Sequence, residues 1–161
     1  MGRVSTELGT YSVVDNFLDS VEYQVIDFIL HNLPWYLQDT QCKTDSPYLA
    51  HTFYSEDHVS DKLDSVGMFK DKLLAERWLN VRANLYMGGT NQMHRDIFSD
   101  KDHKTAIYYH NDNNGGLNIC GDFVSCKRNR VVLLDSTVEH QGVHDFKKML
   151  INFNYDISSH T

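Results

Sequence analysis

The chain has 161 residues, a length that suits one domain with one hydrophobic core. Its hydrophobic content of 41% is ordinary for a globular protein, and no apolar run approaches the roughly 20 residues that a membrane span needs. The formal net charge of −7 argues against generic binding to nucleic acid or anionic membranes, because neutralising phosphates requires clustered lysines and arginines.

The cysteines match no closed zinc-binding spacing, and their number is odd: Cys42, Cys120 and Cys126. Free thiols are typical of a reducing compartment. The first residues also lack the basic start and apolar stretch of a signal peptide. We therefore expect a cytoplasmic protein that has no membrane partner.

The first third of the chain predicts a strand and then a helix. Residues 11–17, "YSVVDNF", have a strand pattern, and Asp19 with Glu22 matches the capping box of a helix start. Apolar residues follow on one helical face: Val21, Val25, Phe28 and Ile29. A weaker helical pattern runs from about residue 55 to residue 78 and includes Met68, Phe69, Leu73, Leu74 and Trp78.

From residue 80 the sequence changes to short β-like runs separated by turns, namely residues 80–87, 104–110, 116–120, 129–135 and 147–157. Helices first and strands afterwards predict an α+β fold, with the N-terminal helices packed on one side of a β-sandwich or barrel. We expect a single domain over residues 1–161. Its strand and helices would occupy about residues 10–79, and its β core about residues 80–157.

Two of the predicted strands alternate polar and apolar side chains. One face of the first strand carries Asn80, Arg82, Asn84 and Tyr86, and one face of the last carries Lys148, Leu150, Asn152 and Asn154. A half-exposed sheet with its polar face in water explains this pattern. A polar interior, with the opposite apolar face covered by the N-terminal helices, explains it equally well.

The triplet His94-Arg95-Asp96 has a kinase interpretation that fails. A kinase catalytic loop continues to an asparagine at the fifth position beyond the aspartate, where this chain has Lys101. No glycine-rich phosphate loop precedes the triplet, and "GDF" at 121–123 does not place its aspartate first.

A metal interpretation of the same triplet is consistent with its spacing. Residues at i and i+2 of an extended segment point the same way, so His94 and Asp96 can supply a nitrogen and an oxygen to one ion. A facial triad then needs a distant histidine. His140 fits best, and His144 is the rival, in a turn region close to the next strand. Two further histidines lie beside an acidic loop and a turn, where we expect them to be solvated: His103 and His110.

An Fe(II) ion with open positions would accept a bidentate 2-oxo acid, whose far carboxylate needs a buried cation. Lys148, at the start of the last predicted strand, has the required inward alternation if its neighbour Lys147 points outward. A surface lysine at a strand start is the alternative.

The ordered set of His94, Asp96, His140 and Lys148 resembles the non-haem Fe(II)/2-oxoglutarate-dependent dioxygenases. It is most similar to the prolyl-hydroxylase-like branch, which includes small phage and bacterial members. Residues 107–111 and the Gly-Gly-Leu at 115–117 match strands of that family. The resemblance covers about residues 80–156 and implies a double-stranded β-helix, a jelly-roll or cupin-like core, with the N-terminal helices packed on one sheet.

The resemblance implies the site and its cofactors. His94, Asp96 and His140 would bind Fe(II), and Lys148 would pair with the C5 carboxylate of 2-oxoglutarate. The tyrosines and threonine expected around this cosubstrate are Tyr109, Tyr86 and Thr105. Polar residues that face substrate or support the ligands would be Arg82, Asn84, Arg95, Asn152 and Asn154. O₂ is the second cosubstrate, and ascorbate is the expected reductant.

The implied reaction is hydroxylation of a C–H bond in a prolyl residue or another amino acid or peptide, with release of succinate and CO₂. The partner is then a small-molecule, peptide or protein substrate, and the sequence leaves the oligomeric state open. The carboxylate at Asp96 argues against the halogenating relatives. A non-catalytic jelly-roll module that binds metal or ligand is the alternative, and a third is another metal-dependent reaction on the same fold that does not need Lys148.

Overall fold

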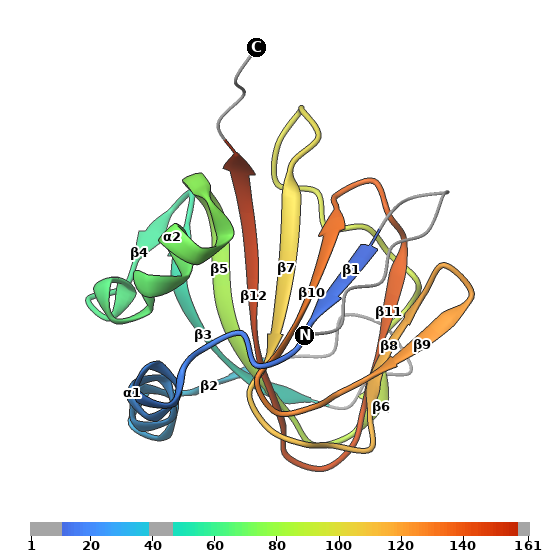
Figure 1. The fold of residues 1–161 in the computed structure, drawn as a ribbon, viewed down its shortest axis with the longest axis horizontal. Helices are drawn as coiled ribbons and strands as arrows, with labels where there is room; N and C mark the ends of the chain where they lie inside the picture. Colours follow the sequence, from blue (N-terminus) through green and yellow to red (C-terminus); the bar gives the residue numbers. More distant parts are fainter. Residues whose placement is uncertain (1–10, 39–46, 158–161) are drawn as a thin grey trace.

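The larger of two antiparallel sheets carries most of the chain in this computed structural model, which describes residues 11–38 and 47–157. The strand order is β1-β10-β7-β12-β5-β3-β2, with β4 paired to β3 (Figure 1). The strands are β1 (Tyr11–Val14), β2 (Tyr36–Gln38), β3 (Tyr48–Ser55), β4 (His58–Val59), β5 (Ala75–Tyr86), β7 (Lys104–Tyr109), β10 (Arg130–Asp135) and β12 (Lys148–Ile157).

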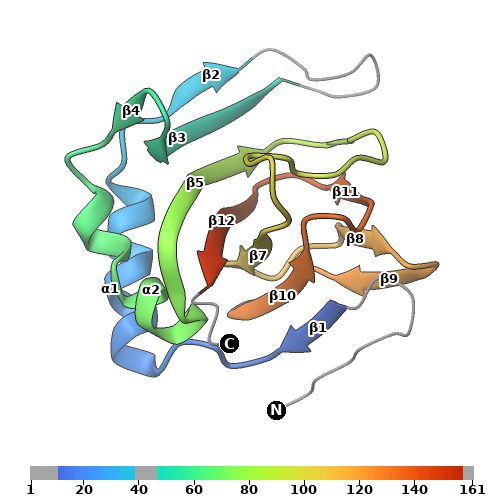
Figure 2. The ribbon, with the colours of Figure 1, turned by 90° about the horizontal axis from the view of Figure 1, so that it is seen from above.

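The smaller sheet faces the larger one and has the order β6-β11-β8-β9. Its strands are β6 (Gly89–Thr90), β8 (Gly116–Ile119), β9 (Asp122–Ser125) and β11 (His140–His144). Seen from above, the long strands curve around an interior that this sheet closes on the opposite side (Figure 2). The arrangement is the double-stranded β-helix that the sequence predicts.

Two helices cover the outer face of the larger sheet: α1 (Ser20–His31) and α2 (Met68–Leu73), with the 3-10 turn η1 (Leu63–Val66) between β4 and α2 (Figures 1 and 2). Ile26 of α1 and Phe69 of α2 pack in one core with Val81, Ile151 and Phe153 of the central strands. The polar side chains of those strands therefore face the interior. Of the two explanations of the alternation, the covered apolar face is correct.

The start of α1 is as predicted, but its buried face is not. Asp19 and Glu22 form both hydrogen bonds of the capping box. The buried residues are Ile26 and Leu30, whereas the predicted apolar face is largely exposed, with Val21 at 68%, Val25 at 42% and Phe28 at 67%. The physical reason lies in a polar contact that orients the helix.

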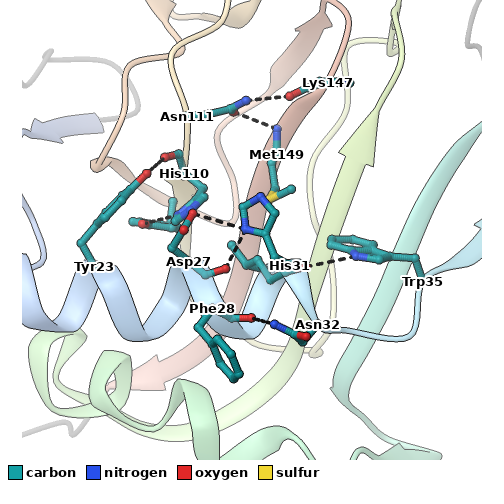
Figure 3. Close-up of polar contacts among 12 residues, drawn as sticks. Tyr23, Asp27, Phe28, His31, Asn32, Trp35, His110, Asn111, Lys147 and Met149 are labelled. Carbon is teal, nitrogen blue, oxygen red and sulfur yellow. Dashed lines mark hydrogen bonds and ion pairs between the residues drawn. The ribbon is translucent and has the colours of Figure 1, made fainter.

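That contact joins α1 to the end of β7 through His110 (Figure 3). Nε2 of His110 lies 2.7 Å from Oδ1 of Asp27, and Nδ1 lies 2.8 Å from the hydroxyl of Tyr108. The ring stacks on Tyr23 at 4.6 Å, and the Tyr23 hydroxyl donates to the His110 carbonyl. His110 is 2% exposed, so its expected solvation is wrong.

The same correction applies to His103, which is 4% exposed. Its backbone N–H donates to the hydroxyl of Ser136, and its Nε2 accepts from the backbone N–H of Phe98. Both histidines are buried because distant residues satisfy their polar atoms.

The helical pattern expected for residues 55–78 is only partly correct. Two strands, β3 and β4, precede the short η1 and α2 segments. Leu74 ends α2 in the left-handed region with φ 56°, and β5 begins at Ala75, so Trp78 lies in a strand. Within the described residues no helix is long and apolar enough to cross a membrane. Cys126 is a free thiol, and Cys42 lies outside the described residues.

Candidate metal centre

The backbone brings His94 and His140 side by side. The two residues form an antiparallel bridge, with N–O distances of 2.9 and 2.8 Å between their backbones. Asp96 lies two residues beyond His94, and the candidate ligand atoms of all three side chains lie within 4.8 Å of one another. The structure therefore unites the three predicted ligands at the mouth of the space between the sheets.

Each histidine is oriented by a backbone carbonyl. Nδ1 of His94 lies 2.8 Å from the carbonyl of Gln92, and Nδ1 of His140 lies 3.1 Å from that of Val138. In a neutral ring whose Nδ1–H donates to a carbonyl, Nε2 keeps its lone pair for a metal. The two Nε2 atoms lie 3.2 and 3.5 Å from the carboxylate oxygens of Asp96.

The donor set fits an Fe(II) site of the facial-triad type. Two imidazole nitrogens and one carboxylate occupy one side of an ion and leave other positions open, as in non-haem Fe(II) oxygenases. Burial raises the pKa of Asp96, but hydrogen bonds from protons on Nε2 of His140 and His94 outweigh that effect and hold the pKa well below its ordinary value. A bound metal would take the place of those protons. The carboxylate is therefore ionised at neutral pH, as a ligand must be.

A cavity of about 140 Å³ opens beside these three residues. It lies between the inner faces of both sheets, and its lining is mostly polar. The residues that line it are Asn80, Arg82, Asn84, Tyr86, Asn91, His94, Asp96, Phe98, Ile107, Tyr109, Leu117, His140, Gly142, His144, Lys148, Leu150, Asn152 and Asn154.

Lys148 is a fully buried cation inside this cavity, 1% exposed. Its Nζ donates to the carbonyls of Gly116 and Val143, both at 2.9 Å, and lies 3.2 Å from Nδ1 of His144. Burial lowers the pKa of Lys148 to about 8. Two backbone carbonyls and one side chain, that of His144, therefore hold the ammonium in place.

His144 was the histidine that the sequence placed in a turn. It is instead the last residue of β11, and its side chain lines the cavity. Burial first, and then the charge of Lys148, lower the pKa of His144 to about 3, so the ring is neutral. Because His140, Gly142 and His144 alternate along one strand, the period of two is the signal that could have identified it.

The residues expected around 2-oxoglutarate divide into two groups. Tyr86 stacks on His144 with 3.5 Å between ring centroids, and the Tyr109 ring lies 5.1 Å from Nζ of Lys148. The Tyr109 hydroxyl is buried without a hydrogen-bond partner. Thr105 does not line the cavity, and its hydroxyl donates to Oδ1 of Asn154. The structure thus brings the two tyrosines to Lys148 but not the threonine.

The remaining predicted residues also differ in position. Arg82, Asn84, Asn152 and Asn154 line the cavity. Arg95 does not: its guanidinium lies 3.2 Å from the carboxylate of Glu139, and both side chains are about half exposed. Arg95 therefore belongs to the surface outside the cavity.

No protein-family model matches the sequence, and no curated protein matches it. Solved structures do share its fold. A prolyl-4-hydroxylase from Pseudomonas putida is 14% identical, with a TM-score of 0.65, and the alignment covers 94% of this chain and 95% of that one. A 2OG-Fe(II) oxygenase-family protein from Burkholderia pseudomallei is 11% identical, with a TM-score of 0.74 and coverage of 93% and 86%.

HygX from Streptomyces hygroscopicus, whose structure holds nickel and 2-oxoglutarate, is 12% identical, with a TM-score of 0.64 and coverage of 95% and 85%. At these identities the comparison establishes a shared fold. The resemblance to the Fe(II)/2-oxoglutarate dioxygenases that the sequence predicts is confirmed at that level.

Proposed function

We propose that the protein is an Fe(II)- and 2-oxoglutarate-dependent dioxygenase that hydroxylates a C–H bond of an amino acid or peptide. The observation that carries this proposal is a triad of His94, Asp96 and His140 that shares one cavity with the buried cation Lys148. A metal triad alone fits many reactions. A buried ammonium in the same cavity adds the requirement for an anionic cosubstrate.

His94, Asp96 and His140 would hold the iron, each through a side chain whose other polar atoms or neighbours fix its orientation. With iron, 2-oxoglutarate and O₂ bound, the site supplies the oxidising power that inserts one oxygen into a C–H bond and the other into succinate, with loss of CO₂. The work of the protein is ligation, exclusion of water and placement of substrate.

Lys148 would pair with the C5 carboxylate of 2-oxoglutarate. Two carbonyls fix its Nζ, and the third contact, to neutral His144, is the one that a carboxylate would replace with a stronger charge-assisted bond. The unpartnered Tyr109 hydroxyl, next to Lys148, would donate to the same carboxylate. Tyr86 would form a wall of this end of the cavity.

The size of the cavity also supports a small cosubstrate. At about 140 Å³ it is well below the roughly 300–1,000 Å³ of pockets that enclose drug-sized ligands.

Solved structures of the same fold hold small molecules, namely hygromycin B in HygX and nogalamycin RO in the epimerase SnoN. The free thiol of Cys126 is in keeping with a reducing, cytoplasmic location.

Succinate release tests the proposal. Purified protein supplied with Fe(II), ascorbate and 2-oxoglutarate should form succinate slowly without substrate and faster with it, and His94→Ala should abolish both rates. Stoichiometric Zn²⁺ in the purified protein, together with no succinate and no stabilisation by 2-oxoglutarate, would instead identify a non-catalytic binding module.

A further inference from the structure

We propose that Arg82 and Asn84 bind the carboxylate and the ammonium group of a free α-amino acid, so that the substrate is an amino acid and not a residue within a peptide. This inference rests on the proposed function, which it narrows to one substrate class. It starts from polar atoms inside the cavity that have no partner.

Arg82 is a cation in the cavity lining without a carboxylate partner among the described residues. Its Nε is buried and makes no hydrogen bond, and its guanidinium lies over the Tyr48 ring at 5.6 Å. Three other described arginines pair with carboxylates, namely Arg77, Arg95 and Arg130, whereas Arg128 lies over the Tyr23 ring. A buried donor that makes no hydrogen bond destabilises the protein. An anionic ligand that accepts a hydrogen bond from Arg82 would remove this cost.

Arg82 is a second cation in the cavity besides Lys148, and the distance between them indicates that each binds its own anion. Arg82 pairs in register with Asn152, four residues along β12 from Lys148, so about 13 Å of strand separates the two backbone positions. The stacked rings of Tyr48 and Tyr86, 4.9 Å apart, lie next to Arg82 on one side and Lys148 on the other. If 2-oxoglutarate binds Lys148 through one carboxylate, the Arg82 guanidinium is therefore left to bind a carboxylate of another molecule.

Asn84 supplies the complementary acceptor. The residue is 4% exposed and lines the cavity, and its Nδ2 donates to the Tyr86 hydroxyl at 3.3 Å. The other amide atom, Oδ1, is buried and has no hydrogen-bond donor among the described residues. Asn84 lies two residues from Arg82 on the same inward face of β5, about 7 Å along the strand.

A free amino acid matches this pair of groups. Arg82 offers a charged donor for a carboxylate, and Asn84 offers an acceptor for an ammonium group. The amide of Asn152, opposite Arg82 on β12, lines the same part of the cavity. A residue inside a peptide has neither charge at its backbone, so it would leave Arg82 buried without an anion.

The test is a thermal-shift titration of the full chain loaded with Mn²⁺ and N-oxalylglycine, which occupies the cosubstrate position. The probes are the standard L-amino acids and, as matched controls, their C-terminal amides. At least one acid should stabilise the protein while its amide does not. Arg82→Gln should weaken that binding about tenfold or more, because a charge-assisted bond is lost. Arg77→Gln, an exposed arginine on the same strand, should leave it unchanged.

Three results would overturn the inference: equal stabilisation by acids and amides, no stabilisation by any amino acid, or unchanged binding in Arg82→Gln. The same titrations without N-oxalylglycine separate it from the proposed function. Failure of Mn²⁺ and N-oxalylglycine to bind would count against the dioxygenase. The selective, Arg82-dependent binding of amino acids would still be measured on the unloaded protein.

Discussion

Two clusters of histidine and aspartate lie on opposite sides of the larger sheet. In one, His140 and His94 point their Nε2 atoms at Asp96 next to the cavity. In the other, beneath α1, both ring nitrogens of His110 are engaged. Nε2 contacts Asp27 (Figure 3), and Nδ1 contacts the Tyr108 hydroxyl. His140 and His110 are equally buried, at 3% and 2% exposure.

The comparison teaches that residue type and burial do not distinguish a metal ligand from a structural histidine. What differs is the partner of the second nitrogen. A backbone carbonyl orients each histidine ring of the triad and leaves both Nε2 atoms directed at Asp96. His110 instead has a side-chain partner at each nitrogen. The second histidine at Asp27, His31, is exposed and approaches Oδ1 with its Nδ1, which also contacts the Asp27 carbonyl. The triad is therefore arranged for a ligand, and the His110 cluster fixes α1 to the sheet.

Replacing one histidine by alanine in each cluster is the strongest test of the difference between them. His140→Ala should weaken Mn²⁺ or Fe(II) binding by about 100-fold or more, because loss of a ligand exceeds the roughly 10–100-fold cost of losing an outer-shell partner. His110→Ala should leave metal affinity unchanged. Calorimetric titration of metal into both variants measures the difference, and equal losses would show that the two clusters are not distinct.

The free energy of unfolding of the same two variants should show the opposite order, with the larger loss in His110→Ala. His110→Ala leaves the buried Tyr108 hydroxyl without its partner and removes the shorter of the two histidine contacts of Asp27, which should lower the free energy of unfolding by about 1–3 kcal/mol. Urea denaturation followed by circular dichroism measures this loss. A variant as stable as the wild type would mean that the contact does not hold α1 in place.

The pH dependence of 2-oxoglutarate binding tests the other end of the cavity. Burial lowers the pKa of Lys148 to about 8, so the unliganded side chain loses its proton, and with it the attraction for a carboxylate, as the pH rises above that value. Affinity should be constant below pH 8 and fall up to about tenfold per unit above it. Lys147→Met, at the exposed neighbour, should keep this profile, whereas Lys148→Met should bind weakly at every pH. A flat wild-type profile would exclude Lys148 as the anchor.

The smallest expected effect concerns the Tyr109 hydroxyl. Because this buried group has no partner among the described residues, Tyr109→Phe should leave stability unchanged or raise it. Its affinity for 2-oxoglutarate should fall by only about 2–10-fold, the value of one hydrogen bond. Unfolding and calorimetric titration of the one variant give both numbers, and a loss of stability with unchanged affinity would reverse the assignment.

Sequence periodicity was sufficient where a strand alternates strictly. The inward faces of β5 and β12 follow from a period of two, and the structure has them as predicted. His94 and Asp96 lie outside the strands, and their side chains nevertheless come together with His140. The capping box at Asp19 is also local and was predicted correctly.

The errors concern residues whose environment is set by distant partners. The burial of His110 depends on Asp27, which is 83 residues away, and the same contact selects which face of α1 is buried. Thr105 lies on the same face of β7 as Tyr109, but its hydroxyl donates a hydrogen bond to Asn154 on the neighbouring strand and does not line the cavity. Strand β4 was missed because the chain from about residue 55 was assigned by helical spacing, whereas β4 pairs with β3. Strand β3 was not predicted, and it pairs with β5, which lies further along the chain.

The most direct test of the central claim, that one cavity joins a metal triad to a carboxylate anchor, is calorimetric titration of 2-oxoglutarate into the protein with and without Mn²⁺. If the claim is correct, 2-oxoglutarate binds at one site per chain and only when the metal is present, since the metal and Lys148 hold opposite ends of the molecule. Binding of equal strength without metal, or no binding with it, would contradict the claim.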